Sequence, residues 1–392
     1  MQYNFDEVID RRNTASYKYD LRKQFFKDPD VLPMWVADMD FRTPDFVINA
    51  LHERLNHEVL GYSFHPESQY QSIIDWNRKR HGWDIKKEWI GFTPGVVPAL
   101  NFTVLAFTQP GDKVIVQTPV YFPFYSAVTE HGRQLIPNPL VLENGHYRID
   151  FDNLKAQIDS QTKMLILCSP HNPTGNVWRR EELKELTDIC LRNNILIVSD
   201  EIHADVVYPG YEHIPTHTLG EEIANNTITL MAASKTFNIA GLATSYYVVS
   251  NNSQFSTMDK AIGKFHLGMG NILGNTALEA AYNNGEDWLL QLIAYLQQNI
   301  LFTKDFINNN IPVLKLIEPE ATFMLWIDFR ETGIEDQQLR NLLVKDARVG
   351  LSNGILFGPD GEGFQRINIG CPRATLEKGL RQIAGALRKV LR

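Results

Sequence analysis

The chain of 392 residues has few cysteines, no long apolar run and no excess of positive charge. Its three cysteines, Cys168, Cys190 and Cys371, are far apart and odd in number, which predicts free thiols in a reducing cytoplasm. The net charge of -8 argues against nucleic acid or an anionic membrane as a partner. The first residues have neither the basic region nor the apolar stretch of a signal peptide, and no apolar run reaches the length of a membrane span. We therefore expect a cytoplasmic protein with a small-molecule substrate.

Between about residues 90 and 280, apolar runs alternate with amphipathic stretches. The runs have the length of strands buried on both faces, and the stretch 179–192 has leucines at helical spacing. This pattern predicts an α/β fold with a mostly parallel sheet, and the length allows two structural units. The expected strands are Lys113–Gln117, Met164–Cys168, Ile195–Ser199, Thr227–Met231 and Ser245–Val249.

Polar side chains follow three of these strands. Asn172 lies in SPHNPTG (169–175), Asp200 in SDEIH (199–203), and Lys235 in MAASKTFNIAG (231–241). Ligands of such sheets collect outside the carboxyl ends of the strands, so we expect the three side chains to meet there. A lysine in such a place can lose its proton and attack an aldehyde.

In this order and at these intervals, Asn172, Asp200 and Lys235 resemble the active-site series of pyridoxal 5'-phosphate (PLP) enzymes with the aspartate aminotransferase fold. The resemblance implies the PLP-dependent transferase fold of type I, with a large PLP-binding domain and a smaller α+β domain built from both termini. We predict that the large domain covers residues 46–285 and the small domain residues 1–45 and 286–392.

PLP needs a lysine for its aldehyde, an acid at its pyridine nitrogen, a ring to stack on and a phosphate cradle. Lys235 is the predicted lysine, and Asp200 is placed at the nitrogen, where it keeps the ring protonated. The alternative for Asp200 is capping of the next turn. Asn172 is assigned to the 3-oxygen of the ring, although Asn-Pro-Thr-Gly is also typical of a plain turn. His203 is a second candidate to bind the same oxygen, at a position where aminotransferases often have a tyrosine.

The phosphate cradle is assigned to Thr93–Ala99, which leads into an apolar helix. The free amides of Gly95, Val96 and Val97 at a helix start favour a dianion, and Pro98 suits the first helical turn. The same segment also fits an ordinary turn before a core helix.

Two further residues are assigned to the phosphate. Ser234 is beside the lysine, and Tyr62, in Gly61–Ser68, is predicted to reach a phosphate across a dimer interface. The family usually has an arginine eight residues past the lysine, but Ala243 occupies that position here. Other groups must therefore supply the donors or the charge.

The ring-stacking residue is predicted to be Tyr121, in TPVYFPFY (118–125), because this segment follows the strand that ends at Gln117. We count Tyr121 with Lys235 among the catalytic candidates. Phe122 and Tyr125 are the alternatives, and an aromatic residue is more often part of the core.

Arg366 is the predicted clamp for the substrate carboxylate, with Arg373 in reserve. For either arginine a surface ion pair is an equally common role. The amide of Ala37, in WVADMDF (35–41), is expected near the same carboxylate. No metal site is predicted, because the segment between His213 and His217 contains Pro215 and does not suit two ligands on one helical face.

The resemblance covers nearly the whole chain and is closest to the MalY/PatB group, which are cystathionine β-lyases or C–S lyases of the class I/II aminotransferase superfamily. It implies a homodimer that converts cystathionine, or another L-cysteine S-conjugate, to a thiol such as homocysteine, pyruvate and ammonia, in sulfur amino acid metabolism and methionine biosynthesis. The alternatives are an aminotransferase, which uses the same groups up to removal of the Cα proton, and a regulatory protein that uses the fold to bind another protein. The segments that carry the resemblance are 35–41, 61–65, 93–98, 169–175, 199–205, 233–242 and 366–373.

Overall fold

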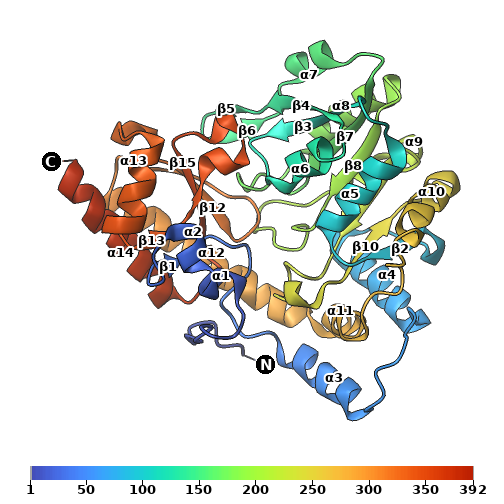
Figure 1. Cartoon of the computed structure of the whole chain (residues 1–392), viewed down its shortest axis with the longest axis horizontal. Coiled ribbons are helices and arrows are strands. Elements are labelled where there is room, and N and C mark those ends of the chain that lie inside the picture. The colour runs from blue at the N-terminus through green and yellow to red at the C-terminus, as the bar shows by residue number, and fades with distance from the viewer. Residues whose placement is uncertain (1, 392) are drawn as a thin grey trace.

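The computed structural model describes residues 2–391 and has an α/β architecture around a seven-stranded sheet (Figure 1). The strand order is β2-β10-β9-β8-β7-β3-β4, and β10 is the one strand that runs antiparallel to its neighbours. The expected mostly parallel sheet is therefore confirmed, and β2 and β4 are strands that the sequence pattern did not reveal. The strands are β2 (Ile90–Thr93), β3 (Lys113–Thr118), β4 (Gln134–Pro139), β7 (Thr162–Cys168), β8 (Leu196–Asp200), β9 (Thr227–Met231) and β10 (Ser245–Val248).

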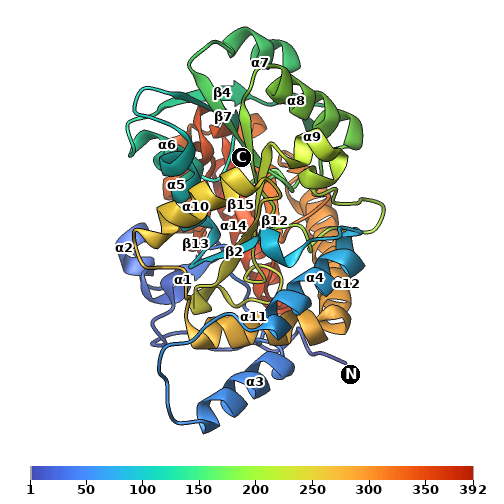
Figure 2. The ribbon, with the colours of Figure 1, turned by 90° about the vertical axis from the view of Figure 1, so that its right-hand side faces the viewer.

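Both faces of this sheet are covered by helices, which explains the continuous apolar runs. Along β7, Met164 and Ile166 pack into one cluster, with residues of α5, α6 and α10, while Leu165 and Leu167 pack into another, with residues of α8. Alternate side chains of a strand point to opposite faces, so a strand covered on both sides has no polar face. Figure 2 shows α5 and α6 on one side of the strands and α8 and α9 on the other. The helices are α5 (Val96–Phe107), α6 (Pro123–Thr129), α7 (Phe151–Gln157), α8 (Arg180–Arg192), α9 (Glu221–Ala224) and α10 (Asn252–Gly263).

A second, antiparallel sheet of four strands has the order β11-β12-β15-β14. Long helices from the C-terminal part of the chain pack with it, and α12 and α14 contribute apolar side chains to the largest buried cluster. The elements are β11 (Lys315–Ile317), β12 (Met324–Asp328), β13 (Val349–Gly350), β14 (Ser352–Asn353), β15 (Phe364–Asn368), α12 (Glu286–Asn310), α13 (Asp336–Asn341), the π-helix η5 (Leu342–Asp346), the 3-10 helix η6 (Gly354–Phe357) and α14 (Arg373–Val390).

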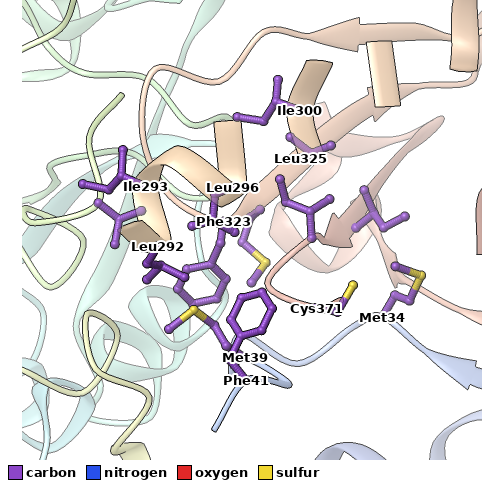
Figure 3. Packing of buried hydrophobic residues seen from close by; sticks show 14 of the residues in the cluster. Met34, Met39, Phe41, Leu292, Ile293, Leu296, Ile300, Phe323, Leu325 and Cys371 are labelled. Atoms are coloured by element: carbon purple, nitrogen blue, oxygen red, sulfur yellow. The ribbon is translucent and has the colours of Figure 1, made fainter. Parts of the chain in front are cut away.

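The N-terminal segment lies against this C-terminal part. β1 (Leu32–Pro33) pairs in parallel with β13, and the blue N-terminal elements lie beside the orange and red ones in Figure 1. Figure 3 shows Met34, Met39 and Phe41 in the cluster that also contains Leu292 and Leu325. The domain boundaries at 45/46 and 285/286 stay a prediction. The remaining α-helices and strands are α1 (Tyr17–Asp20), α2 (Arg22–Phe26), α3 (Asp45–Asn56), α4 (Glu67–His81), α11 (Ile272–Asn284), β5 (Val141–Glu143) and β6 (His146–Arg148).

Among residues 2–391, no helix is both long enough and apolar enough to cross a membrane.

Candidate active site

The carboxyl edge of the large sheet opens into a cavity of about 190 Å³. β8 ends at Asp200, β7 ends at Cys168 shortly before Asn172, and β9 ends at Met231 shortly before Lys235. Three side chains that are far apart in the sequence therefore meet at one place, because neighbouring parallel strands end at the same edge. The predicted residues that line this cavity are Ala37, Gly95, Val96, Val97, Tyr121, Asn172, Asp200, His203, Ser234 and Lys235.

Lys235 is half-buried, and its Nζ donates a hydrogen bond to the carbonyl oxygen of Ala37 at 2.6 Å. Burial lowers the pKa of its amine to about 8, while the charge of Asp38 opposes that shift and Arg366 adds to it. A lysine amine with this pKa is a nucleophile near neutral pH, which an ordinary surface lysine is not.

Asp200 is buried, with 5% of its surface exposed. Its Oδ1 accepts a hydrogen bond from the backbone N–H of Ile202 at 3.1 Å, so the side chain does cap the following turn. Burial raises the pKa of this carboxyl to about 7, and no basic group of residues 2–391 forms an ion pair with it. A buried carboxylate without a cation is the partner that a protonated pyridine ring requires.

Asn172 and His203 complete this side of the cavity. The side-chain oxygen of Asn172 accepts a hydrogen bond from Nη1 of Arg366 at 2.9 Å, which links the predicted ring-binding and substrate-binding residues. Burial, followed by the nearby charges of Lys235 and Arg366, lowers the pKa of His203 to about 3, so its imidazole is neutral. The Nδ1 of His203 is buried and has no hydrogen-bond partner within residues 2–391.

The opposite end of the cavity lies at the start of α5. Gly95 is the N-cap residue of this helix, and no side chain caps it. The first amides of a helix have no partner within the helix, so those of Val96 and Val97 remain available to an anion. Ser234 and Thr244 line the same cavity, as does Ala243, and Lys235 is the one lysine or arginine in that lining. This end thus offers neutral donors where the family has a guanidinium.

The three aromatic candidates for ring stacking lie in different surroundings in the structure. Tyr121 lines the cavity, whereas Phe122 and Tyr125 do not. The hydroxyl of Tyr125 donates to the carbonyl of Phe357, and the side chain of Phe122 is 47% exposed. Tyr121 is thus the one of the three that lies where a ring can stack.

Arg366 lies in the middle of β15 and is 3% exposed. Its Nη2 donates to the carbonyl of Trp35 at 2.9 Å, and its Nε is buried without a partner in residues 2–391. This unpaired donor fits a carboxylate acceptor. Arg373, the reserve candidate, starts α14, and its Nε donates to the side-chain oxygen of Asn299 at 2.7 Å, outside the cavity.

Tyr62 is the predicted site residue that lies elsewhere. It stands between α3 and α4 with 97% of its surface exposed, and it does not line the cavity. Its role therefore requires a second copy of the chain, as the prediction itself stated.

The segment 35–41 is fixed by side chains that the sequence reading did not single out. The amide of Asn368 donates to the carbonyls of Val36 and Asp38, each at 2.6 Å, and the amide of Asn238 donates to those of Met39 and Phe41. These bonds hold the carbonyl of Ala37 against Lys235. The only signal in the sequence was that Asn368 and Asn238 lie inside segments already chosen for Arg366 and Lys235.

A second network fixes the same segment from the N-terminal side. Arg11 donates to both oxygens of Asp38, at 3.0 and 2.6 Å, and to Asp40 at 2.7 Å. Lys18, which is 1% exposed, pairs with Asp40 at 2.8 Å. Asp38 thus lies close enough to oppose part of the lowering of the Lys235 pKa. Arg11 and Lys18 balance the negative charge of Asp38.

The donor set of the cavity fits PLP. A lysine amine of lowered pKa, a buried carboxylate without a cation, a neutral imidazole and an uncapped helix start are the four kinds of group that its aldehyde, pyridine nitrogen, 3-oxygen and phosphate require.

Comparisons with known proteins agree with this geometry. The model of the family "Aminotransferase class I and II" matches residues 29–383. Cystathionine β-lyase PatB of Bacillus subtilis is 42% identical, over 98% of this chain and 100% of its own length, and protein MalY of Escherichia coli is 33% identical, over 99% and 100%. The crystal structure of cystalysin from Treponema denticola, which contains PLP, superposes with a TM-score of 0.96 at 37% identity and covers 100% of both chains.

Proposed function

Because the chain belongs to the class I and II aminotransferase family, we propose that it is a PLP-dependent C–S lyase that cleaves cystathionine or related L-cysteine S-conjugates to a thiol, pyruvate and ammonia. The full-length similarity to cystathionine β-lyase PatB supports this reaction. The observation that carries the proposal is the meeting of Lys235, Asp200 and the start of α5 in one cavity, with the carboxylate-binding Arg366 joined to Asn172.

PLP, when bound, supplies an aldehyde that combines with amines and a ring that takes up the electron pair released at Cα. Lys235 would hold PLP through its aldehyde, and its amine, when free, would take the proton from Cα of the substrate. Asp200 would balance the positive charge of the ring nitrogen, and Asn172 and His203 would donate hydrogen bonds to the 3-oxygen. The carbonyl of Ala37 keeps Nζ of Lys235 in place for the proton transfer.

The substrate is oriented by Arg366, whose buried guanidinium binds the α-carboxylate with Nε as the free donor. Removal of the Cα proton leaves an electron pair next to Cβ, and the thiolate departs from Cβ as that pair forms a double bond. Hydrolysis of the remaining three-carbon fragment gives pyruvate and ammonia.

The experiment that tests this function is incubation of the purified enzyme with cystathionine in the absence of any keto acid. We expect thiol and pyruvate in equal amounts, because elimination needs no amino-group acceptor. An aminotransferase instead stops after one turnover unless a keto acid is present. Product formation that depends on added keto acid therefore contradicts the proposal.

We also propose that the enzyme is a homodimer in which Tyr62 binds the cofactor phosphate of the partner subunit. An exposed apolar patch, consisting of Val59, Leu60, Tyr62 and Phe64, with Phe265, Leu267 and Met269, supports this interface. The hydrogen bond from the His65 side chain to the carbonyl of Gly268, at 3.0 Å, joins the two segments of the patch.

For the Tyr62→Phe variant we expect the dimer to persist and the affinity for PLP to fall roughly tenfold to 150-fold, the value of one hydrogen bond to a charged group. Sedimentation gives the mass, and fluorescence titration of the cofactor-free protein with PLP gives the affinity. Tyr211, which is exposed elsewhere, provides the matched Tyr→Phe control. Wild-type affinity in Tyr62→Phe, or a monomeric wild type, contradicts the proposal.

A further inference from the structure

A second and larger cavity, of about 670 Å³, continues from the first. The two share Ala37, Tyr121 and Lys235 in their linings, and Arg366 lines the second. A substrate whose carboxylate lies on Arg366 and whose Cα lies at Lys235 would have its sulfur substituent beside the second cavity, because both residues line it.

The wall of this cavity is mostly apolar. Phe25 and Trp35 have ring centroids 4.6 Å apart, and Tyr17 packs on Trp35 at 5.5 Å. Facing the cavity from other elements, Ile355 and Leu356 of η6 are 50% and 52% exposed. Exposed apolar side chains gathered at an opening favour a ligand with an apolar part.

The charges on this wall are of one sign. Lys235, Arg366 and Arg340 line it, and no aspartate or glutamate does. Lys235 and Arg366 are held by backbone carbonyls at the inner end. Arg340, near the end of α13, is exposed, and its guanidinium has no hydrogen bond or ion pair with any of residues 2–391. It is a cation without a partner on the wall of a substrate cavity.

The carboxylate nearest along the helix does not neutralise Arg340. Asp336, four residues earlier on α13, accepts a hydrogen bond from the side-chain amide of Asn353 at 2.6 Å through Oδ2, and it forms no ion pair within 4 Å. The positive charge at position 340 is therefore available to an anionic ligand, with the strength expected of a solvent-exposed guanidinium.

We propose that Arg340 determines specificity by binding a carboxylate at the far end of the sulfur substituent. Building on the C–S lyase reaction proposed above, the preferred substrates are L-cysteine thioethers whose apolar chain ends in a carboxylate. The wall has no acidic group for a distal ammonium, so the amino group of the homocysteine half of cystathionine gains nothing from this cavity.

The test compares substrates that differ only in the distal charge. S-(3-carboxypropyl)-L-cysteine and S-(5-carboxypentyl)-L-cysteine are each paired with the terminal amide of the same length, and cystathionine is the amino-bearing form of the shorter acid. We expect kcat/KM for the better of the two acids to exceed that of its amide by about twofold to fivefold at low salt, with the ratio falling as salt is added.

The matched variants are Arg340→Gln and Arg348→Gln. Arg340→Gln is expected to bring the acid-to-amide ratio close to one without changing kcat/KM for the amides, since the amides carry no distal carboxylate and the guanidinium is exposed and has no partner to lose. Arg348 comes shortly after α13 in the chain, but it pairs with Asp30 and lies outside the cavity, so its variant should keep the wild-type ratio.

Three results would overturn the inference: a ratio near one for both lengths in the wild type, a ratio that survives in Arg340→Gln, or a higher kcat/KM for cystathionine than for S-(3-carboxypropyl)-L-cysteine. Each of these leaves the lyase reaction intact, because pyruvate still forms. Absence of pyruvate from every thioether would instead contradict the proposed function itself.

Discussion

The Lys235→Ala variant will lose turnover by a factor of about 10⁴ or more, together with the visible absorbance that PLP acquires when it is joined to a lysine. Lys235 is the one lysine that lines the cavity, and its amine both holds the cofactor and moves the Cα proton. Nothing else in that lining combines an amine with a lowered pKa. Pyruvate formation from cystathionine and a visible spectrum of the purified protein measure the two losses.

Lys113 supplies the matched control for this variant. It lies at the beginning of β3, at the opposite edge of the sheet, and pairs with Asp159 at 2.5 Å on the surface. Lys113→Ala should retain both the absorbance and the rate. Turnover at the wild-type rate in Lys235→Ala would remove the lysine from the mechanism.

The pH dependence of PLP binding by the cofactor-free protein gives an independent measure of the pKa of the Lys235 amine. Only the unprotonated amine attacks an aldehyde, and with a pKa of about 8 roughly one-tenth of Lys235 is unprotonated at pH 7. The rate at which cofactor-free protein captures PLP should therefore rise with pH and level off above about pH 8. A rate that still climbs steeply near pH 10 would indicate an ordinary lysine.

The sequence was sufficient to predict which side chains meet wherever polar residues follow a buried strand. Asn172, Asp200 and Lys235 each come soon after an apolar run, and a parallel sheet brings the ends of such runs to one edge. In the pairing of β7, β8 and β9, Cys168 lies opposite Asp200, and Asp200 lies opposite Leu230. This register brings residues that are far apart in the chain close together in space. The family resemblance supplied the roles that spacing alone leaves open.

The rest depends on contacts between segments that no local pattern connects. Arg366 and Arg373 occur in one motif, yet the first lies inside a strand that faces the cavity and the second starts a helix that points elsewhere. No sequence pattern singled out Arg340. Its position follows from the fold, which brings α13 and the N-terminal aromatics Tyr17, Phe25 and Trp35, more than 300 residues away in the chain, to the wall of one cavity.

The Asp200→Asn variant is expected to lose roughly 100- to 1,000-fold in kcat, which corresponds to about 3 to 4 kcal/mol in the activation free energy. A carboxylate about 3 Å from a ring cation contributes on the order of 5 kcal/mol at an effective dielectric constant of about 20, before desolvation is subtracted. An asparagine cannot hold that cation, so the ring nitrogen loses its proton and the ring accepts electrons poorly. Steady-state pyruvate formation measures the loss.

Asparagine at position 200 removes the negative charge but keeps nearly the same side-chain shape. Its side-chain oxygen can still accept the hydrogen bond from the N–H of Ile202, so the turn after β8 is kept and the melting temperature should change little. A PLP analogue methylated at the ring nitrogen carries a permanent positive charge and does not need the carboxylate to maintain it. We therefore expect this analogue to restore a substantial part of the rate in Asp200→Asn. If it restores none while the variant remains folded and binds the analogue, Asp200 acts through the turn, and the electrostatic role assigned to it is wrong.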